Sequence, residues 1–206
     1  GNFAGKAGMS EALFKFTGAC LGHRKGGVAM AAIGACAGFG AICGSSLATA
    51  ATMGKVALPE LRRLGYSGAL STGTLAAGGT LGILIPPSVI LIIYSILTEQ
   101  NIAKMFLAAF IPGILAALGY IIAIALYVRF VKDSGPTKDR VGWKERLSLF
   151  KNIWQIILIF IVMIGGIYLG WFTPTEGGAI GAGGAGLIAI SNKNFKFKDL
   201  VDVIEN

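Results

Sequence analysis

The sequence predicts an all-α, polytopic membrane protein with a re-entrant helical hairpin, a broken transmembrane helix and interfacial amphipathic helices. Hydrophobic residues make up 54% of the 206 residues and only 14% are charged, where a typical soluble domain carries about 25%. Four long stretches hold no charged residue: residues 26–54, 64–98, 105–128 and 152–175. Each is longer than the roughly 20 residues that cross the hydrocarbon core as one helix. This composition excludes a disordered chain and a soluble domain.

The basic residues predict which side of the membrane the connections face. Of the 18 Lys and Arg residues, 17 lie in residues 1–25, 55–63, 129–151 and 193–206, and Lys104 is the exception. Because cytoplasmic loops carry an excess of Lys and Arg, we expect these four segments on the cytoplasmic side. The net charge of +8 then serves orientation and contact with lipid headgroups. We therefore expect the lipid bilayer, and no nucleic acid, as the partner of these charges.

Residues 26–63 are predicted to form a re-entrant hairpin, because their uncharged part starts and ends beside cytoplasmic basic residues. One helix over the 29 residues of 26–54 would measure about 43 Å, too long for an untilted crossing. Two helices of about half that length are too short to cross twice. The turn is expected at Gly44-Ser45-Ser46, where glycine allows the chain to reverse and Ser45 or Ser46 caps the returning helix. A single, steeply tilted helix is the alternative.

Residues 64–98 are predicted to form a transmembrane helix that is broken at Pro86 and Pro87. Proline has no N–H and clashes with the carbonyl four residues back, so the two prolines release the carbonyls of Gly82 and Ile83. Free carbonyls at this depth are tolerated only against protein or a polar cavity. A simple proline kink, satisfied by neighbouring helices, is the alternative.

Two further segments are predicted to be cytoplasmic and to hold helices that lie along the membrane surface. Residues 1–25 contain an amphipathic helix at Ser10–Leu21. Residues 131–151 contain a solvated loop followed by a second amphipathic helix at Trp143–Phe150. Both helices mix aromatic and leucine side chains with basic ones, which is typical of interfacial helices.

The remaining apolar segments are predicted to cross the membrane. Residues 99–130 are expected to form an ordinary transmembrane helix, and residues 152–192 to form two helices. The second of these begins near Pro174 and Glu176, because proline and an acidic residue both suit the first turn of a helix. Glycines spaced four apart within residues 152–192 allow close packing of the two helices.

Uncharged oxygen atoms gather where the predicted hairpin tip meets the predicted helix break. Ser45, Thr49 and Thr52 fall on one helical face, and Ser46 lies beside them at the turn. With the released carbonyls, these hydroxyls offer hard oxygen ligands without charge, which suit a dehydrated Na⁺, while the N-terminus of a half-helix suits an anion. Hydrogen bonding to neighbouring helices explains the same hydroxyls equally well.

The sequence contains no recognisable catalytic motif. There is neither a G-x-S-x-G nor an H-E-x-x-H motif, and no carboxylate lies within the four apolar stretches. His23, the single histidine, lies in a basic surface turn, and no base near Cys43 in the sequence could activate its thiol. We therefore expect a protein that is not an enzyme. An intramembrane enzyme that uses Cys43 or Ser45 and a structural membrane subunit are the alternatives.

Three segments, taken in order, resemble a known family. They are residues 34–54, which read GACAGFGAICGSSLATAATMG, residues 78–88, which read GGTLGILIPPS, and residues 172–176, which read FTPTE. These segments look like the large membrane subunit of the tripartite ATP-independent periplasmic (TRAP) transporters, the DctM-like permeases. The resemblance covers nearly the whole chain.

The resemblance implies a permease subunit of a Na⁺-coupled secondary transporter in the bacterial inner (plasma) membrane. Such a transporter imports organic acids, a C4-dicarboxylate or a similar carboxylate, by an elevator-type movement of a transport domain against a scaffold. The resemblance also implies two protein partners, a small membrane subunit and a periplasmic substrate-binding protein. No cofactor is expected apart from Na⁺ as the coupling ion.

By position, the resemblance also assigns site residues. It implies an inner hairpin tip made of Gly44, Ser45, Ser46 and Thr49. It implies an unwound stretch that contains Gly82, Ile85 and Pro87. One Na⁺ is then expected at Ser45, Gly82, Ile85 and Pro87.

The chain departs from the family in length, because it is about half as long as the family's usual subunit. By the resemblance, residues 152–192 would open the scaffold of the second repeat, and residues 193–206 would start the next surface arm. The first scaffold helices, the second hairpin and the second broken helix are expected to be missing. We therefore expect this piece alone not to transport.

Overall fold

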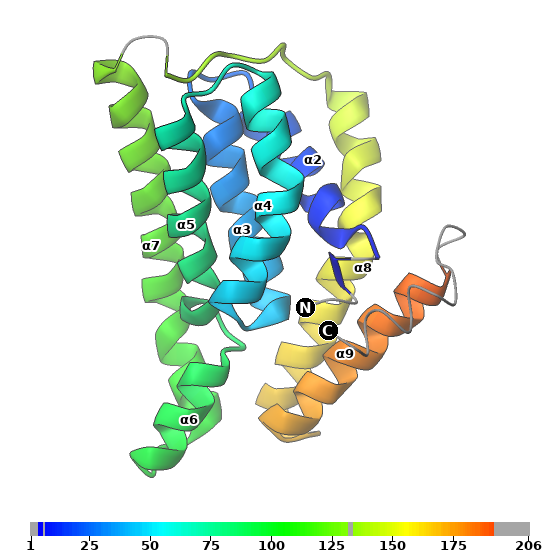
Figure 1. The fold of residues 1–206 in the computed structure, drawn as a ribbon. Coiled ribbons are helices and arrows are strands. Elements are labelled where there is room, and N and C mark those ends of the chain that lie inside the picture. The colour runs from blue at the N-terminus through cyan, green and yellow to red at the C-terminus, as the bar shows by residue number, and fades with distance from the viewer. Residues whose placement is uncertain (1–3, 6, 132–133, 192–206) are drawn as a thin grey trace.

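The computed structural model describes residues 4–5, 7–131 and 134–191, and its regular secondary structure there is entirely α-helical (Figure 1). The helices longer than a single turn are α2 (Met9–Leu21), α3 (Gly27–Cys43), α4 (Ser46–Arg63), α5 (Gly68–Leu84), α6 (Val89–Leu97), α7 (Ile102–Phe130), α8 (Trp143–Tyr168) and α9 (Pro174–Ser191). The predicted all-α fold class is confirmed for this part of the chain. The surface arm expected at 193–206 lies outside the described residues.

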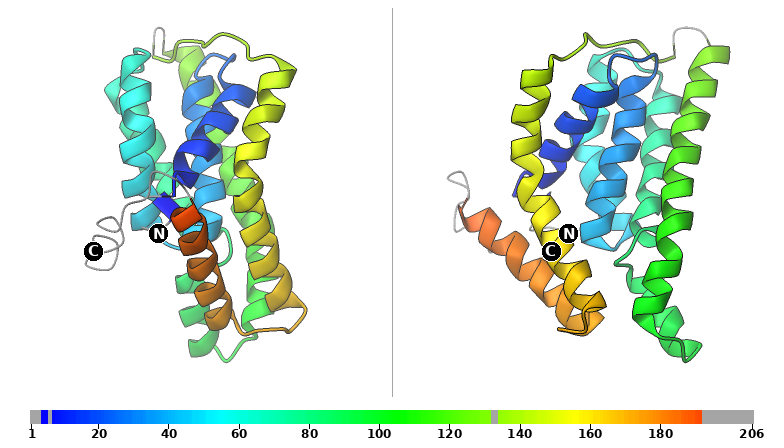
Figure 2. Two further views of the ribbon diagram at one scale, coloured as in Figure 1. Left: turned by 90° about the vertical axis from the view of Figure 1, so that its right-hand side faces the viewer. Right: turned by 180° about the vertical axis from the view of Figure 1, so that it is seen from behind.

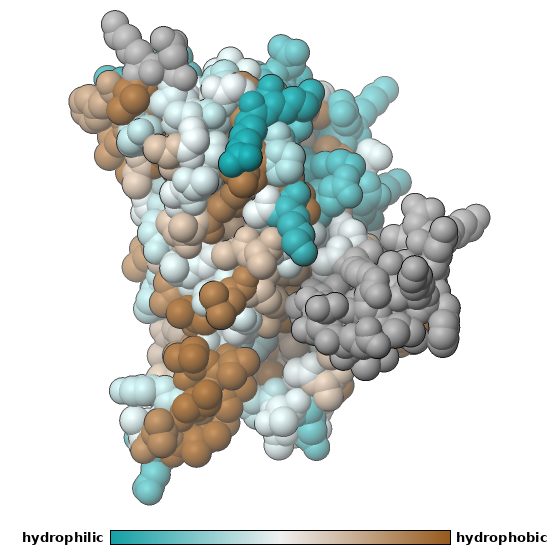
Figure 3. Space-filling view, in the orientation of Figure 1, coloured by the Kyte–Doolittle hydropathy of each residue, from teal (hydrophilic) through white to brown (hydrophobic). Residues whose placement is uncertain are grey.

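The basic connections share one end of the molecule, as the charge distribution predicts. The α2–α3, α4–α5 and α7–α8 connections lie together at the top of Figure 1, and the α6–α7 and α8–α9 connections lie at the bottom. Hydrophilic side chains gather near the upper end of the face in Figure 3, and a hydrophobic area covers α6 near the opposite end. From the excess of Lys and Arg, the upper end is the one that we expect on the cytoplasmic side.

The hairpin predicted at residues 26–63 is formed by α3 and α4. Helix α3 ends at Cys43, Gly44 takes a left-handed conformation with φ 64°, and α4 begins at Ser46. The two helices run antiparallel and reverse partway along α7 (Figure 1). The chain therefore enters and leaves at the same end, and the alternative of one long tilted helix is wrong.

The helix predicted to break at Pro86 and Pro87 does so. Helices α5 and α6 are separated by four residues and meet at an angle of 44°. Together they are long and apolar enough to span a membrane, as are α7, with 29 residues, and α8, with 26. Helix α6 begins anew after Ser88, whose Oγ accepts a hydrogen bond of 3.4 Å from the Leu91 N–H. A complete break, rather than a kink within one helix, is thus confirmed.

The surface helix expected at Trp143–Phe150 is not a separate element. Residues 143–168 form the single helix α8, because no glycine or proline interrupts residues 143–164. Helix α2 covers the amphipathic segment expected at Ser10–Leu21 and lies obliquely against α3 and α8 (Figures 1 and 2). A pair of aromatic rings, Phe16 on α2 and Phe150 on α8, joins these two helices at a centroid distance of 5.8 Å.

Helix α9 begins where the sequence predicts. The Glu176 carboxylate accepts hydrogen bonds from the Thr173 N–H at 2.7 Å and from the Thr173 hydroxyl at 2.9 Å. The Glu176 N–H donates in return to Thr173 Oγ1 at 3.3 Å. This reciprocal capping satisfies N–H groups that a helix start leaves free. The predicted close packing is also confirmed, because a Cβ on Gly181 of α9 would lie 2.8 Å from Met163 Sδ of α8.

The loop after α7 is not the freely solvated segment that its composition predicts. In this loop, Gly135 O accepts a hydrogen bond of 3.0 Å from the Gly26 N–H, and the Lys138 N–H donates one of 2.9 Å to Gly22 O. The buried hydroxyl of Tyr66, in the α4–α5 connection, accepts from the Val28 N–H at 3.1 Å and donates to Pro136 O at 2.8 Å. These bonds connect the loop to the base of the hairpin, both at the start of α3 and in the segment after α4.

An ion pair reinforces the same junction. The Glu60 carboxylate near the end of α4 accepts two hydrogen bonds of 2.8 Å from the Arg63 guanidinium and lies 3.4 Å from Lys138 Nζ of the loop. These partners, Arg63 first, hold the pKa of Glu60 below its usual range. Burial raises the pKa of the Tyr66 hydroxyl, so this group stays a neutral donor.

Replacing Tyr66 by phenylalanine should destabilise the protein by about 1–3 kcal/mol, because the Val28 N–H and the Pro136 carbonyl would lose their partner. The measurement is the thermal unfolding midpoint of the purified permease that carries this sequence. Tyr94→Phe is the matched control, since Tyr94 lies exposed on α6. Equal midpoints for the two variants would contradict the role of Tyr66.

Single cysteines at positions 25 and 55 should react with a membrane-impermeant thiol reagent from the same side of the membrane, and a cysteine at position 99 should react from the other. The reason is that the hairpin returns to the end at which it entered. The measurement is labelling in right-side-out and inverted vesicles, in a background with Cys20, Cys36 and Cys43 replaced by alanine. Labelling of positions 25 and 55 from opposite sides would overturn the hairpin.

Candidate functional site

The hairpin tip touches the broken helix at the break itself. A Cβ added to Gly44, at the tip, would lie 2.8 Å from Pro87 O. The Val89 N–H, at the start of α6, donates a long hydrogen bond of 3.5 Å to Gly44 O. The Pro86–Pro87 peptide bond, which is cis, comes directly before these contacts in the chain. The tip of the hairpin therefore lies against the break between α5 and α6.

Gly82 of α5 lies directly against α4 and α3. A Cβ on Gly82 would lie 2.6 Å from Thr49 Oγ1 and 2.8 Å from Ser45 O. A Cβ on Gly40 of α3 would lie 2.7 Å from the Gly82 Cα. Distances below 3 Å leave no room for a side chain, so the three helices approach this closely only because both positions are glycine.

The Thr49 hydroxyl is buried at this contact and faces Gly82. It donates a hydrogen bond of 2.7 Å to Ser45 O, and its side chain is 0% exposed. A hydroxyl has one hydrogen and two lone pairs, so the oxygen of Thr49 keeps its lone pairs after this bond. Ser45 itself caps α4, because its Oγ accepts a hydrogen bond of 3.4 Å from the Ala48 N–H.

The end of α5 presents backbone carbonyls to the same region. The last helical hydrogen bond runs from the Ile85 N–H to Leu81 O at 2.9 Å. Prolines at 86 and 87 have no N–H to donate to the carbonyls four residues back. Within the described residues, no hydrogen bond to Gly82 O or Ile83 O is found. The two carbonyls that the sequence predicts to be released are indeed without a helical partner.

Four helix ends meet at this site. Helices α3 and α5 end there, and α4 and α6 begin there. Carbonyl groups at a helix C-terminus carry partial negative charge, and N–H groups at an N-terminus carry partial positive charge. No lysine, arginine, aspartate or glutamate lies within residues 26–54 or 64–98, which form these ends. The site therefore offers uncharged dipoles of both signs, suited to a small cation and an anionic group side by side.

The predicted site residues fall into two groups. Gly44, Ser45, Thr49, Gly82 and Pro87 come together at the contact between tip and break. Their roles as ligands remain a prediction.

Three other residues face different neighbours. The Ser46 carbonyl lies beside Gly79, whose Cβ would be 3.3 Å away. The Ile85 side chain is buried against α7, because a Cβ on Gly113 would lie 2.9 Å from its Cγ1. Only the backbone of Ile85 is thus left for the site. Thr52 lies against Gly5 and not at the break, since a Cβ on Gly5 would be 3.2 Å from its Cγ2.

Sequence reasoning missed the glycines that make this contact. A Cβ on Gly78 would lie 2.8 Å from Cys36 Sγ, and one on Gly79 would lie 2.7 Å from the Ala50 Cβ. With Gly82, they place three glycines of α5 in close contact with the hairpin. The spacing Gly-Gly-x-x-Gly was visible in the sequence, as were small residues along α3 and α4. Their pairing depends on the register between helices, which no local pattern specifies.

Replacing Gly82 by alanine should lower the stability of the protein by about 1–3 kcal/mol, because the new methyl group overlaps Thr49 Oγ1 and the backbone of Ser45. The measurement is thermal unfolding of the purified permease. Gly73→Ala on the same helix is the matched control, since nothing lies within 4 Å of a Cβ there, and alanine favours a helix. A G82A protein as stable as G73A would contradict the close approach.

Comparison with known proteins identifies the family of this chain and several relatives. Residues 1–206 match the model of a family described as "Tripartite ATP-independent periplasmic transporter, DctM component". The C4-dicarboxylate TRAP transporter large permease protein DctM of Pseudomonas aeruginosa is 39% identical over 201 residues, which is 97% of this chain and 45% of that protein. The sialic acid TRAP transporter permease protein SiaT of Haemophilus influenzae is 37% identical over 176 residues, 85% of this chain and 28% of that protein.

A third relative has a different substrate in its name. The ectoine/5-hydroxyectoine TRAP transporter large permease protein UehC of Ruegeria pomeroyi is 33% identical over 161 residues, which is 78% of this chain and 37% of that protein. The chain thus spans less than half the length of each of these three relatives. Because the family model matches residues 1–206, the chain belongs to the DctM component family of the tripartite ATP-independent periplasmic transporters.

Proposed function

We propose that the permease carrying this sequence is a Na⁺-coupled secondary transporter that imports an organic acid across the bacterial inner membrane. The observation that carries the proposal is the meeting of four uncharged helix ends at the hairpin tip and the helix break. A C4-dicarboxylate or a similar carboxylate is the proposed substrate. Relatives named for C4-dicarboxylates, at 39% and 38% identity, support this choice.

The oxygen atoms at the break fit a dehydrated Na⁺. The released carbonyl of Gly82, the carbonyls of Ile85 and Pro87, and the Ser45 residue supply neutral oxygen, the ligand type that hard cations prefer. We add the Thr49 hydroxyl to this set, because its lone pairs remain free after it donates to Ser45 O. Binding to neutral ligands lets the ion leave again, since no fixed carboxylate holds it.

The first turn of α4 fits a carboxylate. A helix start leaves its first N–H groups without intrahelical partners, and the Ser45 cap satisfies that of Ala48. The N–H groups of Ser46 and Leu47 remain available, and Leu47 is exposed at the tip. The positive end of the helix dipole favours an anion at this position.

The packing supports an elevator-type movement. Helices α3, α4 and α5 pack directly on one another and α7 packs against α3 and α5, whereas α8 packs mainly against α2 and α9 (Figure 2). The two groups also touch each other: the ring centroids of Phe110 on α7 and Phe160 on α8 lie 6.2 Å apart. We propose that the first group belongs to the moving transport domain and that α8 and α9 belong to the scaffold. A small membrane subunit and a periplasmic binding protein that delivers the substrate are the proposed partners.

The test is uptake of a labelled C4-dicarboxylate into proteoliposomes that contain the permease, its small subunit and the binding protein. Uptake should require an inward Na⁺ gradient and should be competed by unlabelled C4-dicarboxylates. Uptake that proceeds equally in K⁺ would overturn the coupling ion. Uptake of another organic acid in preference would overturn the substrate class but leave the coupling in place.

In the same assay, Thr49→Val should raise the Na⁺ concentration for half-maximal uptake about tenfold, because one oxygen ligand to a charged partner is lost. Valine keeps the shape of the side chain. Thr72→Val is the matched control: the Thr72 hydroxyl also donates to the carbonyl four residues back, at 2.8 Å, but lies exposed on α5. The same Na⁺ dependence in T49V and T72V would reject the assignment of Thr49.

A further inference from the structure

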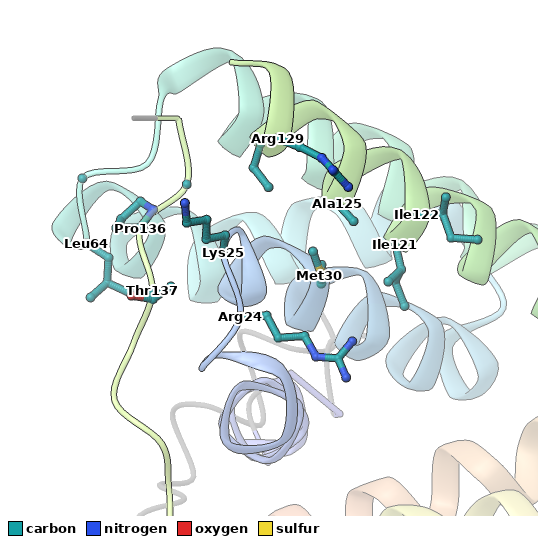
Figure 4. A pocket seen from close by; sticks show the side chains of 13 residues that line it. Arg24, Lys25, Met30, Leu64, Ile121, Ile122, Ala125, Arg129, Pro136 and Thr137 are labelled. Carbon is teal, nitrogen blue, oxygen red and sulfur yellow. The ribbon is translucent and has the colours of Figure 1, made fainter. Parts of the chain in front are cut away.

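A large cavity opens at the cytoplasmic end of the molecule, far along α7 from the hairpin tip. It measures about 1140 Å³ and lies between α3, α7, the α4–α5 connection and the loop after α7 (Figure 4). This volume exceeds the roughly 300–1,000 Å³ of typical small-molecule sites. Arg24 and Arg129 line the cavity from opposite sides, with Met30 and Ile121 between them.

The polar part of the cavity is cationic. Arg24, Lys25 and Arg129 line it, and none of the described lining residues is acidic. The three side chains are exposed, and none of them forms an ion pair with a described residue. By contrast, Glu60 at the same end is fully engaged by Arg63 and Lys138. The cavity thus concentrates positive charge that the described part of the chain leaves uncompensated.

The other wall of the cavity is apolar and continues out of it. Ile121, Ile122, Ala125 and Val128 of α7 line the cavity. Ile122 also belongs to a stripe of exposed side chains along α7, formed by Leu115, Leu118, Ile122 and Leu126, each about half exposed. Their spacing of three or four residues places them on one helix face. A ligand with a charged head and a long apolar tail could follow this wall.

We propose that this cavity binds an anionic glycerophospholipid of the cytoplasmic leaflet. Its phosphate would be held by Arg24, Lys25 and Arg129, and an acyl chain would extend along Ile122 and the apolar stripe of α7. Arginine pairs with phosphate through two parallel hydrogen bonds, and basic pockets between membrane helices are suited to anionic headgroups. The apolar stripe favours a lipid over free phosphate, because free phosphate has no apolar part that could contact it. The proposal goes beyond transport and does not depend on Na⁺ coupling.

The test is native mass spectrometry of the purified permease that carries this sequence, titrated with phosphatidylglycerol or with zwitterionic phosphatidylcholine. Phosphatidylglycerol should bind more tightly, and the double variant R24Q/R129Q should weaken its binding about thirtyfold. The matched control is R62Q/K144Q, which removes the same charge at the same end but from residues outside the cavity. The control should bind phosphatidylglycerol like the unchanged permease.

A second variant tests the apolar wall without a change of charge. Ala125→Trp should fill the cavity and weaken binding of phosphatidylglycerol, while Ala123→Trp, exposed on α7 but outside both the cavity and the stripe, should not. The comparison of these two tryptophan variants also tests the proposal if R24Q/R129Q does not fold.

Four results would overturn the proposal. They are equal binding to R24Q/R129Q and R62Q/K144Q, no preference for phosphatidylglycerol over phosphatidylcholine, no bound lipid on the unchanged permease, and full displacement of the lipid by millimolar inorganic phosphate. The last result would identify a site for free phosphate. The absence of bound lipid would mean that another part of the permease fills the cavity.

Discussion

The structure depends on one constraint: a backbone that stops being helical within an apolar layer must be buried against protein or line a polar cavity. Two elements of this chain stop there, the hairpin at Gly44 and the broken helix at Pro86 and Pro87. Each is tolerated because it lies against the other, and Gly40 and Gly82 permit the backbones to come that close.

The hairpin is held at both of its ends, and the two attachments differ in kind. At the tip, contact is made by glycines and by one hydroxyl, that of Thr49. At the base, Tyr66 and the loop after α7 supply directional hydrogen bonds to Val28 and to Gly26. The loop follows α7 directly, so the hairpin, the broken helix and α7 are linked at the base as well as through their packing. We therefore expect them to move as one body, with the tip fixed on the break.

The sequence predicts the interruptions well and their partners poorly. A glycine turn followed by a capping serine and a pair of prolines are local signals, so the hairpin tip and the break lie where they were expected. The hydrogen bonds of Tyr66 reach residues 38 and 70 positions away, and the contact of Gly40 with Gly82 depends equally on tertiary register. Local pattern also failed at Trp143–Phe150, because amphipathicity describes which face is polar and does not say where a helix ends.

The absence of charge at the tip and break follows from what the proposed transport requires. A fixed carboxylate would hold a cation tightly, and in the empty state it would be a buried charge whose desolvation costs several kcal/mol, or about 2.5–3.5 kcal/mol on insertion scales. Helix ends provide partial charges that are present whether or not a ligand is bound, so the empty site remains neutral. In the proposed transport, a cation beside the ends of α3 and α5 would offset part of the negative charge of a carboxylate bound beside the start of α4. The loaded site would then carry less net charge than the carboxylate alone, which would lower the cost of moving the loaded body through the apolar layer.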